Sequence, residues 1–260
     1  MALAAGQLFS GSEALAARLS CLKCHRPHYQ AQGSCVGCHR GDPRSERLGI
    51  AHHDLITARF SWYGIPGATP VQRGNKLLET YACRRCHTTA GKGNRLASNL
   101  DRLPAGSTPQ EMFDSIKTPA LLMPEFRLED GQITDLVNAI LAGAKQSGPK
   151  GQETPQVVHF EAAKGDAENI FEKKCGACHK VLTRALGAFG KGSIGPNLSG
   201  LFSEFYPPTS HDKRRWRSDS LEQWLKNPRQ SRSNTLMRPV PLQKGEFEKL
   251  LALLSGTPPQ

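Results

Sequence analysis

The chain has 260 residues, of which 38% are hydrophobic and 7% aromatic, and 34 basic against 23 acidic residues give a formal net charge of +11. The mean hydropathy is −0.47, and no stretch contains the roughly 18–20 consecutive apolar residues that a membrane-spanning helix needs. These values exclude an integral membrane protein but not attachment to a membrane. The 25 glycines and 18 prolines favour short helices and long loops, around a core filled partly by something other than side chains.

All eight cysteines belong to four copies of one motif, C-x-x-C-H. The thiols are Cys21 and Cys24, Cys35 and Cys38, Cys83 and Cys86, and Cys175 and Cys178, followed by His25, His39, His87 and His179. This motif is the attachment signature of haem c, in which two thiols bind the porphyrin edge and the histidine binds iron. A disulfide, a redox dithiol or half of a zinc site would not require the histidine. The motifs therefore predict four covalently bound haem c groups, with these four histidines as proximal iron ligands.

On these motifs the sequence resembles the multihaem cytochromes c. The first two motifs start 14 residues apart (35 − 21), which is too close for two separate globular domains. The third and fourth each lie in a segment the size of a single-haem module, and these segments resemble class I cytochrome c domains. We therefore expect an all-α fold with extensive loops. It would comprise a di-haem unit at residues 1–66 and class I domains at 67–148 and 149–260, with a polar linker at 145–155.

Apolar periodicity places helices beside the third and fourth motifs. An amphipathic run at 75–82 leads into Cys83, and a shorter run at 167–171 leads into Cys175. Two closing helices are predicted by apolar residues at helical spacing: Ile133, Leu136, Val137, Ile140 and Leu141 in the middle segment, and Phe247, Leu250, Leu251 and Leu254 in the last. The resemblance implies that the first and last helices of each domain pair beside the haem.

The sixth iron ligand separates an electron carrier from an enzyme. Class I cytochromes place a methionine sulfur on the loop before the last helix, and thioether sulfur is a suitable ligand for haem iron. Met123 and Met237 occupy that place in the two repeats, so the resemblance implies that they are the distal ligands. Met112 lies inside a predicted helix and is expected in the core.

The resemblance also implies two supporting contacts. The segment 195–198, Gly-Pro-Asn-Leu, is similar to the family segment whose proline carbonyl accepts the proximal imidazole N–H. The middle segment has Ser98 in place of that proline, so the resemblance does not carry the contact over to it. Trp224 resembles a family tryptophan near the haem propionates, and a role in packing alone is the other interpretation.

The first two motifs have three further histidines near them, which favours bis-histidine ligation. Two imidazoles on opposite faces of one iron hold their Cα atoms roughly 12 Å apart, whereas three extended residues span at most about 11 Å. His28 therefore cannot reach the far side of the haem held by His25, and we expect it opposite His39. The first haem then takes His52 or His53, of which His52 is preferred because Leu55 and Ile56 follow it at helical spacing.

With four six-coordinate irons, the prediction is a tetrahaem electron carrier rather than an enzyme. It would be either a periplasmic shuttle or the cytochrome subunit of a membrane quinol-oxidising respiratory complex, with redox proteins such as a b-type cytochrome as partners. The alternative is a haem enzyme, a di-haem peroxidase or a sulfur-compound oxidoreductase, with one open or displaceable iron ligand. Nucleic acid is not an expected partner, because the chain is expected to carry haems and its sequence contains no nucleic-acid-binding motif.

The position of the basic residues and the attachment chemistry bear on partners and location. Lys213, Arg214, Arg215 and Arg217 form a basic cluster, which is either a solvated loop or a docking face for an acidic redox partner or an anionic membrane surface. Haem c is attached outside the bacterial cytoplasm, so we expect a periplasmic location or one on the outer face of the cytoplasmic membrane. Residues 1–7 lack the features of an export signal, which we expect to have been trimmed or to lie upstream.

Overall fold

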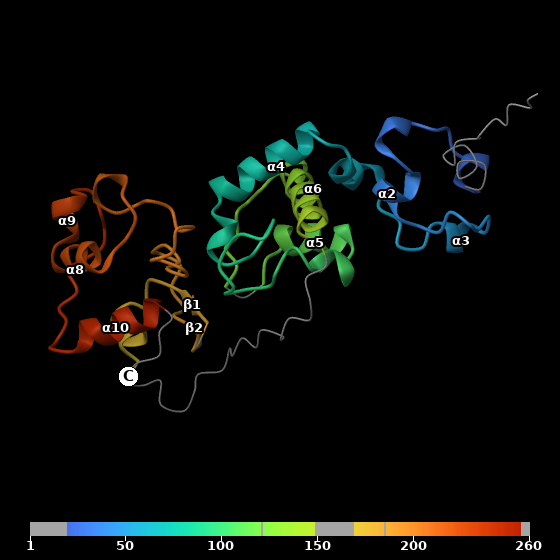
Figure 1. Cartoon of the computed structure of the whole chain (residues 1–260). Coiled ribbons are helices and arrows are strands. Elements are labelled where there is room, and N and C mark those ends of the chain that lie inside the picture. The colour runs from blue at the N-terminus through green and yellow to red at the C-terminus, as the bar shows by residue number, and fades with distance from the viewer. Residues whose placement is uncertain (1–19, 121, 149–168, 185, 256–260) are drawn as a thin grey trace, which may run out of the picture.

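The computed structural model describes residues 20–120, 122–148, 169–184 and 186–255 (Figure 1). The fold is rich in short helices joined by loops, as expected. It departs from an all-α fold in one hairpin, where β1 (Val181–Thr183) pairs antiparallel with β2 (Gly187–Phe189) and Leu182 lies opposite Ala188. The expected export-signal region at 1–7 and most of the expected linker lie outside the described residues.

The N-terminal segment consists of very short elements. They are the 3₁₀ helices η1 (Ser20–Lys23) and η2 (Gln30–Gln32), and the α-helices α2 (Cys35–His39) and α3 (Leu48–Ala51). None of these elements contains a buried residue. Large apolar side chains are exposed here, including Leu48 at 73% and Tyr29 at 57%. Side chains alone therefore provide no core for this segment, which matches a unit built around large prosthetic groups.

The middle segment has a conventional helical core. Its elements are η3 (Ala58–Gly64), α4 (Thr69–Thr80), η4 (Cys83–Arg85), η5 (Leu103–Ala105), α5 (Pro109–Lys117) and α6 (Asp130–Ser147). Helix α4 starts earlier than the amphipathic run at 75–82, with Pro70 in its first turn, a position that tolerates the missing N–H. Helix α5 begins at a capping box in which Thr108 and Glu111 exchange hydrogen bonds. Met112 is buried in α5, as expected.

Helices α4 and α6 pack closely against each other at the centre of this segment (Figure 1). All five apolar residues expected on one face of α6 are buried. The crossing point is Gly74, because a Cβ there would lie 2.0 Å from the carbonyl oxygen of Asp135. One residue earlier, the Arg73 guanidinium binds the Asp135 carboxylate through two hydrogen bonds of 2.6 and 2.8 Å. Gly74 thus allows the backbones of the two helices to approach each other, and the bidentate ion pair between Arg73 and Asp135 stabilises their contact.

Residues 56–64 join the N-terminal segment to the middle core. Ile56 and Phe60 are buried in the same hydrophobic cluster as α6. The side chain of Asn138, fully buried in α6, donates to the Arg59 carbonyl and accepts from the Tyr63 amide. This part of the predicted 1–66 unit therefore packs with the middle segment, and the domain boundaries stay predictions.

The C-terminal segment forms a second core. Its helices are α7 (Ile170–Lys174), η7 (His211–Lys213), α8 (Ser218–Lys226), α9 (Pro228–Ser231) and α10 (Glu246–Ser255). Ile170, Phe171, Leu221 and Leu250 are buried in it, and Phe247 and Leu251 pack against it. Across the parts of the chain that the structure describes, none of the helices has the length and apolar character needed to cross a bilayer.

Candidate haem-binding sites

Each C-x-x-C-H motif folds as a single helical turn. In the first, third and fourth motifs the histidine amide donates to the carbonyl of the first cysteine, at 2.9, 3.0 and 2.9 Å. The second motif is the short helix α2. Residues at i, i+3 and i+4 share one face of a helical turn, so the two thiols and the imidazole of each motif emerge together. No two of the eight cysteines, all of which are described, form a disulfide.

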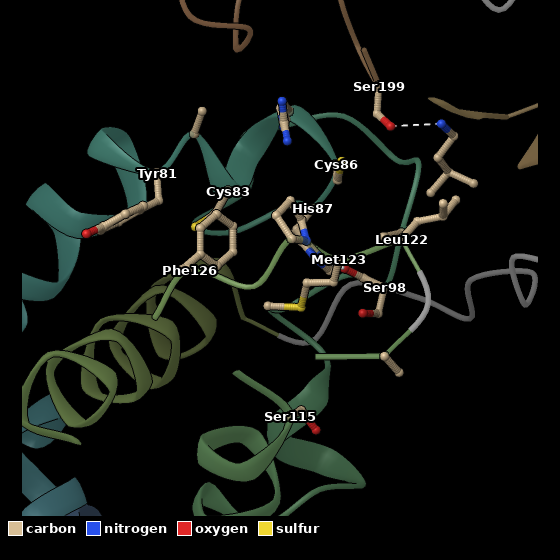
Figure 2. A pocket seen from close by; sticks show the side chains of 16 residues that line it. Tyr81, Cys83, Cys86, His87, Ser98, Ser115, Leu122, Met123, Phe126 and Ser199 are labelled. Atoms are coloured by element: carbon tan, nitrogen blue, oxygen red, sulfur yellow. Dashed lines mark hydrogen bonds between the residues drawn. The ribbon is translucent and has the colours of Figure 1, made fainter. Parts of the chain in front are cut away.

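The third motif opens onto a cavity of about 310 Å³ in the middle segment (Figure 2). A second cavity of about 190 Å³ adjoins it and shares several lining residues. Cys83, His87, Met123 and Phe126 line both, and the walls are almost wholly apolar. The cavity thus brings together the thiol, the predicted proximal ligand and the predicted distal ligand in an apolar space of ligand-pocket size. These residues fit a haem c attached at the third motif.

The apolar walls set the ionisation of the motif side chains. Burial raises the pKa of the Cys83 thiol to about 11 and also raises that of Cys86. Burial lowers the pKa of His87, opposed by its hydrogen bond to Ser98. Cys175 in the fourth motif has its pKa raised to about 11 by burial. Before any haem is attached, the thiols of Cys83, Cys86 and Cys175 are therefore protonated at neutral pH, and His87 is neutral, the imidazole form that binds a metal.

Three of the motif histidines are oriented by a backbone carbonyl. The Nδ1 atom of His179 lies 2.8 Å from the Pro196 oxygen, as the resemblance implies. The Nδ1 atom of His87 lies 2.8 Å from the Ser98 oxygen, so the middle segment makes the same contact without the proline. The acceptor is a main-chain atom, which serine supplies as well as proline does. An Nδ1–H donated in this way leaves Nε2 free to face iron.

The third such carbonyl could not be found from the sequence. The Nδ1 atom of His39 lies 2.9 Å from the oxygen of Ile56, and the His39 carbonyl accepts the Ile56 amide in return. Ile56 is buried in the middle core. No motif marks this residue, and only the packing of 56–64 brings it to the second haem-binding motif.

The N-terminal histidines form two facing pairs. The ring centroids of His25 and His52 are 5.9 Å apart, and those of His39 and His28 are 5.7 Å apart. A metal–imidazole bond of about 2.0–2.1 Å and a ring radius of roughly 1.2 Å would separate two ring centroids across one metal by roughly 6.5 Å. Both observed spacings are shorter than that value by less than about 1 Å, so each pair can hold one iron after a small separation of the rings.

The structure separates the two neighbouring candidates for the first haem. The His52 ring faces His25, whereas the His53 side chain is 76% exposed and its Nδ1 lies 3.3 Å from the Asp54 carboxylate. The geometry therefore favours His52.

The fourth motif lies against a loop and a tryptophan. Gly195 packs on the His179 ring, since a Cβ there would lie 2.3 Å from the ring carbon Cε1. Trp224 Nε1–H donates to the sulfur of Met237 at 3.0 Å, and both side chains pack against the C-terminal core. The Trp224 indole also stacks edge-on against Trp216. The structure thus places Trp224 in packing and in direct contact with the predicted distal ligand.

The basic cluster of the C-terminal segment is a surface feature. Its four residues are all exposed and run from the last residue of η7 to the residue before α8: Lys213, Arg214, Arg215 and Arg217. They lie together on one stretch of chain, and their role in docking stays a prediction.

Comparison with known proteins identifies one part of the chain. Residues 69–138 match the family model described as cytochrome C oxidase, cbb3-type, subunit III. No solved structure matches the chain significantly. The matched region holds the third motif, Met123, all of α4 and the first half of α6. It is thus similar to a c-type cytochrome domain, which supports covalent haem c and electron transfer for this part of the chain.

Proposed function

We propose that the chain is a tetrahaem c-type cytochrome that carries electrons between redox partners. Four haem c groups would be attached at Cys21 and Cys24, Cys35 and Cys38, Cys83 and Cys86, and Cys175 and Cys178. The proximal ligands would be the motif histidines. The distal ligands, in the order of the four motifs, would be His52, His28, Met123 and Met237. When bound, each haem supplies a one-electron couple, and the protein sets its ligands and surroundings.

The observation that carries this proposal is the pairing of histidines in the N-terminal segment. Two predicted distal ligands lie opposite two motif histidines, at ring spacings close to the one that a metal between them would require. The exposed apolar side chains of this segment support the same conclusion, because two porphyrins would cover them. A second donor at each iron leaves no position for a substrate, which favours a carrier over an enzyme.

The ligand types predict an order of potentials. Methionine–histidine ligation raises the potential of haem iron, relative to ligation by two histidines. The N-terminal pair would therefore be the low-potential end of the chain, and the haems at the third and fourth motifs the high-potential end. A redox titration that gave four equal potentials, or the highest potentials to the N-terminal pair, would contradict this order.

The proposed setting is the periplasm or the outer face of the cytoplasmic membrane. The chain would act as a shuttle or as the cytochrome subunit of a membrane quinol-oxidising respiratory complex. The match to an oxidase subunit supports a place in a membrane complex. The exposed basic cluster would then meet an acidic partner, and the rate of association should fall steeply as ionic strength rises.

Electron paramagnetic resonance of the oxidised, haem-loaded chain at low temperature tests the proposal. Four six-coordinate haems give low-spin ferric signals only, and carbon monoxide should not bind the reduced protein readily. A high-spin signal, with about one carbon monoxide bound per chain, would instead favour the haem enzyme. Intact-mass measurement of the chain counts the attached haems independently of both spectra.

A further inference from the structure

The loop 195–200 of the C-terminal segment lies directly on the third haem-binding motif. Arg85, inside that motif, donates from Nη1 to the carbonyl oxygen of Asn197 at 3.0 Å. The Asn197 side chain donates from Nδ2 to the carbonyl oxygen of Leu122 at 3.2 Å. Leu122 precedes Met123, the predicted distal ligand. One residue of the C-terminal segment therefore touches the middle site on both its proximal and its distal side.

The same loop holds the proximal histidine of the fourth motif. The residue before Asn197 is Pro196, whose carbonyl oxygen lies 2.8 Å from Nδ1 of His179. The two acceptors are the carbonyls of consecutive peptide units, so the backbone of one residue, Asn197, joins the acceptor of the Arg85 hydrogen bond to the acceptor of the His179 hydrogen bond. The route from motif to motif runs through Arg85, the Asn197 backbone, the Pro196 carbonyl and the His179 ring.

The contact is closely packed on both sides. Ser199 is fully buried and, with Leu182, lines the cavity of the middle segment at the edge near Cys86 (Figure 2). Gly200 has a φ of +68°, and a Cβ there would lie 2.7 Å from the Arg85 carbonyl oxygen. Backbones that approach this closely need glycine at the point of contact.

Tyr206 also contacts the Arg85 side chain. The Arg85 guanidinium carbon lies 5.6 Å from the centre of the Tyr206 ring, within the range of a cation–π interaction. The Tyr206 hydroxyl donates to the same Asn197 oxygen at 3.2 Å, and the ring is 6% exposed. Arg85 is therefore held by an oxygen and by a ring, both from the C-terminal segment.

We propose that Arg85 and Asn197 dock the C-terminal segment onto the third haem-binding motif and so form the electron-transfer contact between the third and fourth haem sites. Both act as positioning residues. The proposed electron path rests on the proposed function, while the docking itself does not. One electron passes in each event: the donor iron goes from ferrous to ferric and the acceptor iron from ferric to ferrous, with no proton moved and no bond made or broken.

The test compares the double variant Arg85→Ala/Asn197→Ala with the natural chain, both haem-loaded. Arg84→Ala is the matched control, because Arg84 is the neighbouring residue of the same motif and its guanidinium binds Glu79 and Thr89 within the middle segment. The single variants serve if the double variant does not fold. Intact mass establishes the number of attached haems in each protein.

The first readout is amide hydrogen exchange at 122–123 and at Gly195 and Leu198, which reports docking whatever the redox behaviour. The Ser199 amide is left out because it donates to the Asn197 side chain, which the variant removes. Loss of the two interactions should raise exchange at both segments by at least tenfold, as one tenfold step corresponds to about 1.4 kcal/mol. Arg84→Ala should leave both segments unchanged. Exchange in the double variant equal to that of the natural chain would overturn the docking.

The second readout is electron exchange between individual haems, followed by magnetisation transfer between their paramagnetically shifted methyl resonances in half-reduced samples. Exchange between the third and fourth haems should fall at least tenfold in the double variant, and exchange within the N-terminal pair should not change. An unchanged third-to-fourth rate despite lost protection would refute the electron path. Fewer than four attached haems, or a high-spin ferric signal, would instead contradict the proposed function. In that case the amide hydrogen exchange still decides whether the two segments dock.

Discussion

Replacing Gly74 by alanine tests the close approach of α4 and α6. The new Cβ would lie 2.0 Å from the Asp135 carbonyl oxygen and 2.7 Å from the Ala139 Cβ. These atoms belong to a helix backbone and a short side chain, so the helices must move apart. Overpacking of this kind costs about 3 kcal/mol, the upper end of the usual range, and the better helix propensity of alanine returns about 1 kcal/mol. We therefore expect a net loss of about 2 kcal/mol.

Gly131→Ala is the matched control, since Gly131 lies in α6 and a Cβ there would have no heavy atom within 4 Å. It should leave stability unchanged or raise it by up to about 1 kcal/mol. Urea unfolding of the haem-loaded chain, followed by circular dichroism and by haem absorption, measures both. The movement should also disturb the haem spectrum of the middle segment, because α6 lines its cavity through Leu136 and Ile140. Equal urea midpoints for the two variants would refute the crossing geometry.

Three further outcomes are expected. Asn138→Leu leaves the Arg59 carbonyl and the Tyr63 amide without their partner, so it should cost about 2–4 kcal/mol in urea unfolding; a loss below about 0.5 kcal/mol would contradict the role of Asn138. The Arg44 guanidinium lowers the pKa of Asp42 to about 2 by hydrogen bonding. The stabilisation that this ion pair gives the folded state is therefore complete above about pH 4 and is lost as the pH falls towards 2. Nuclear magnetic resonance titration should show the Asp42 pKa return towards 3.8 in Arg44→Gln, and an unchanged pKa would exclude Arg44 as the cause of the shift. Trp224→Phe removes the hydrogen bond that withdraws electron density from the Met237 sulfur. The potential of the fourth haem should therefore fall by about 40 mV, the equivalent of about 1 kcal/mol for one electron. An unchanged potential would contradict Met237 as a ligand of that iron.

The attachment chemistry could be predicted from the residue pattern alone, because it depends on spacing within five residues. Cys83, Cys86 and His87 share one helical turn wherever the chain goes, and the same local rule applies to the other three motifs. The buried face of α6 followed from periodicity for the same reason. The hairpin β1–β2 was not expected, since strands of three residues are too short to show a period.

Which distant groups meet could not be predicted in this way, because it depends on the three-dimensional path of the backbone. His52 and His53 are neighbours in sequence, and the direction of the chain after α3 turns one towards His25 and the other towards solvent and Asp54. The carbonyls of Ser98 and Ile56 orient His87 and His39, and a main-chain oxygen has no signature in the side-chain sequence. The contact of Arg85 with Asn197 joins residues 112 positions apart. Local spacing governs bonds made within a turn, whereas contacts between turns depend on how the backbones pack, and that is settled only when the whole chain has folded.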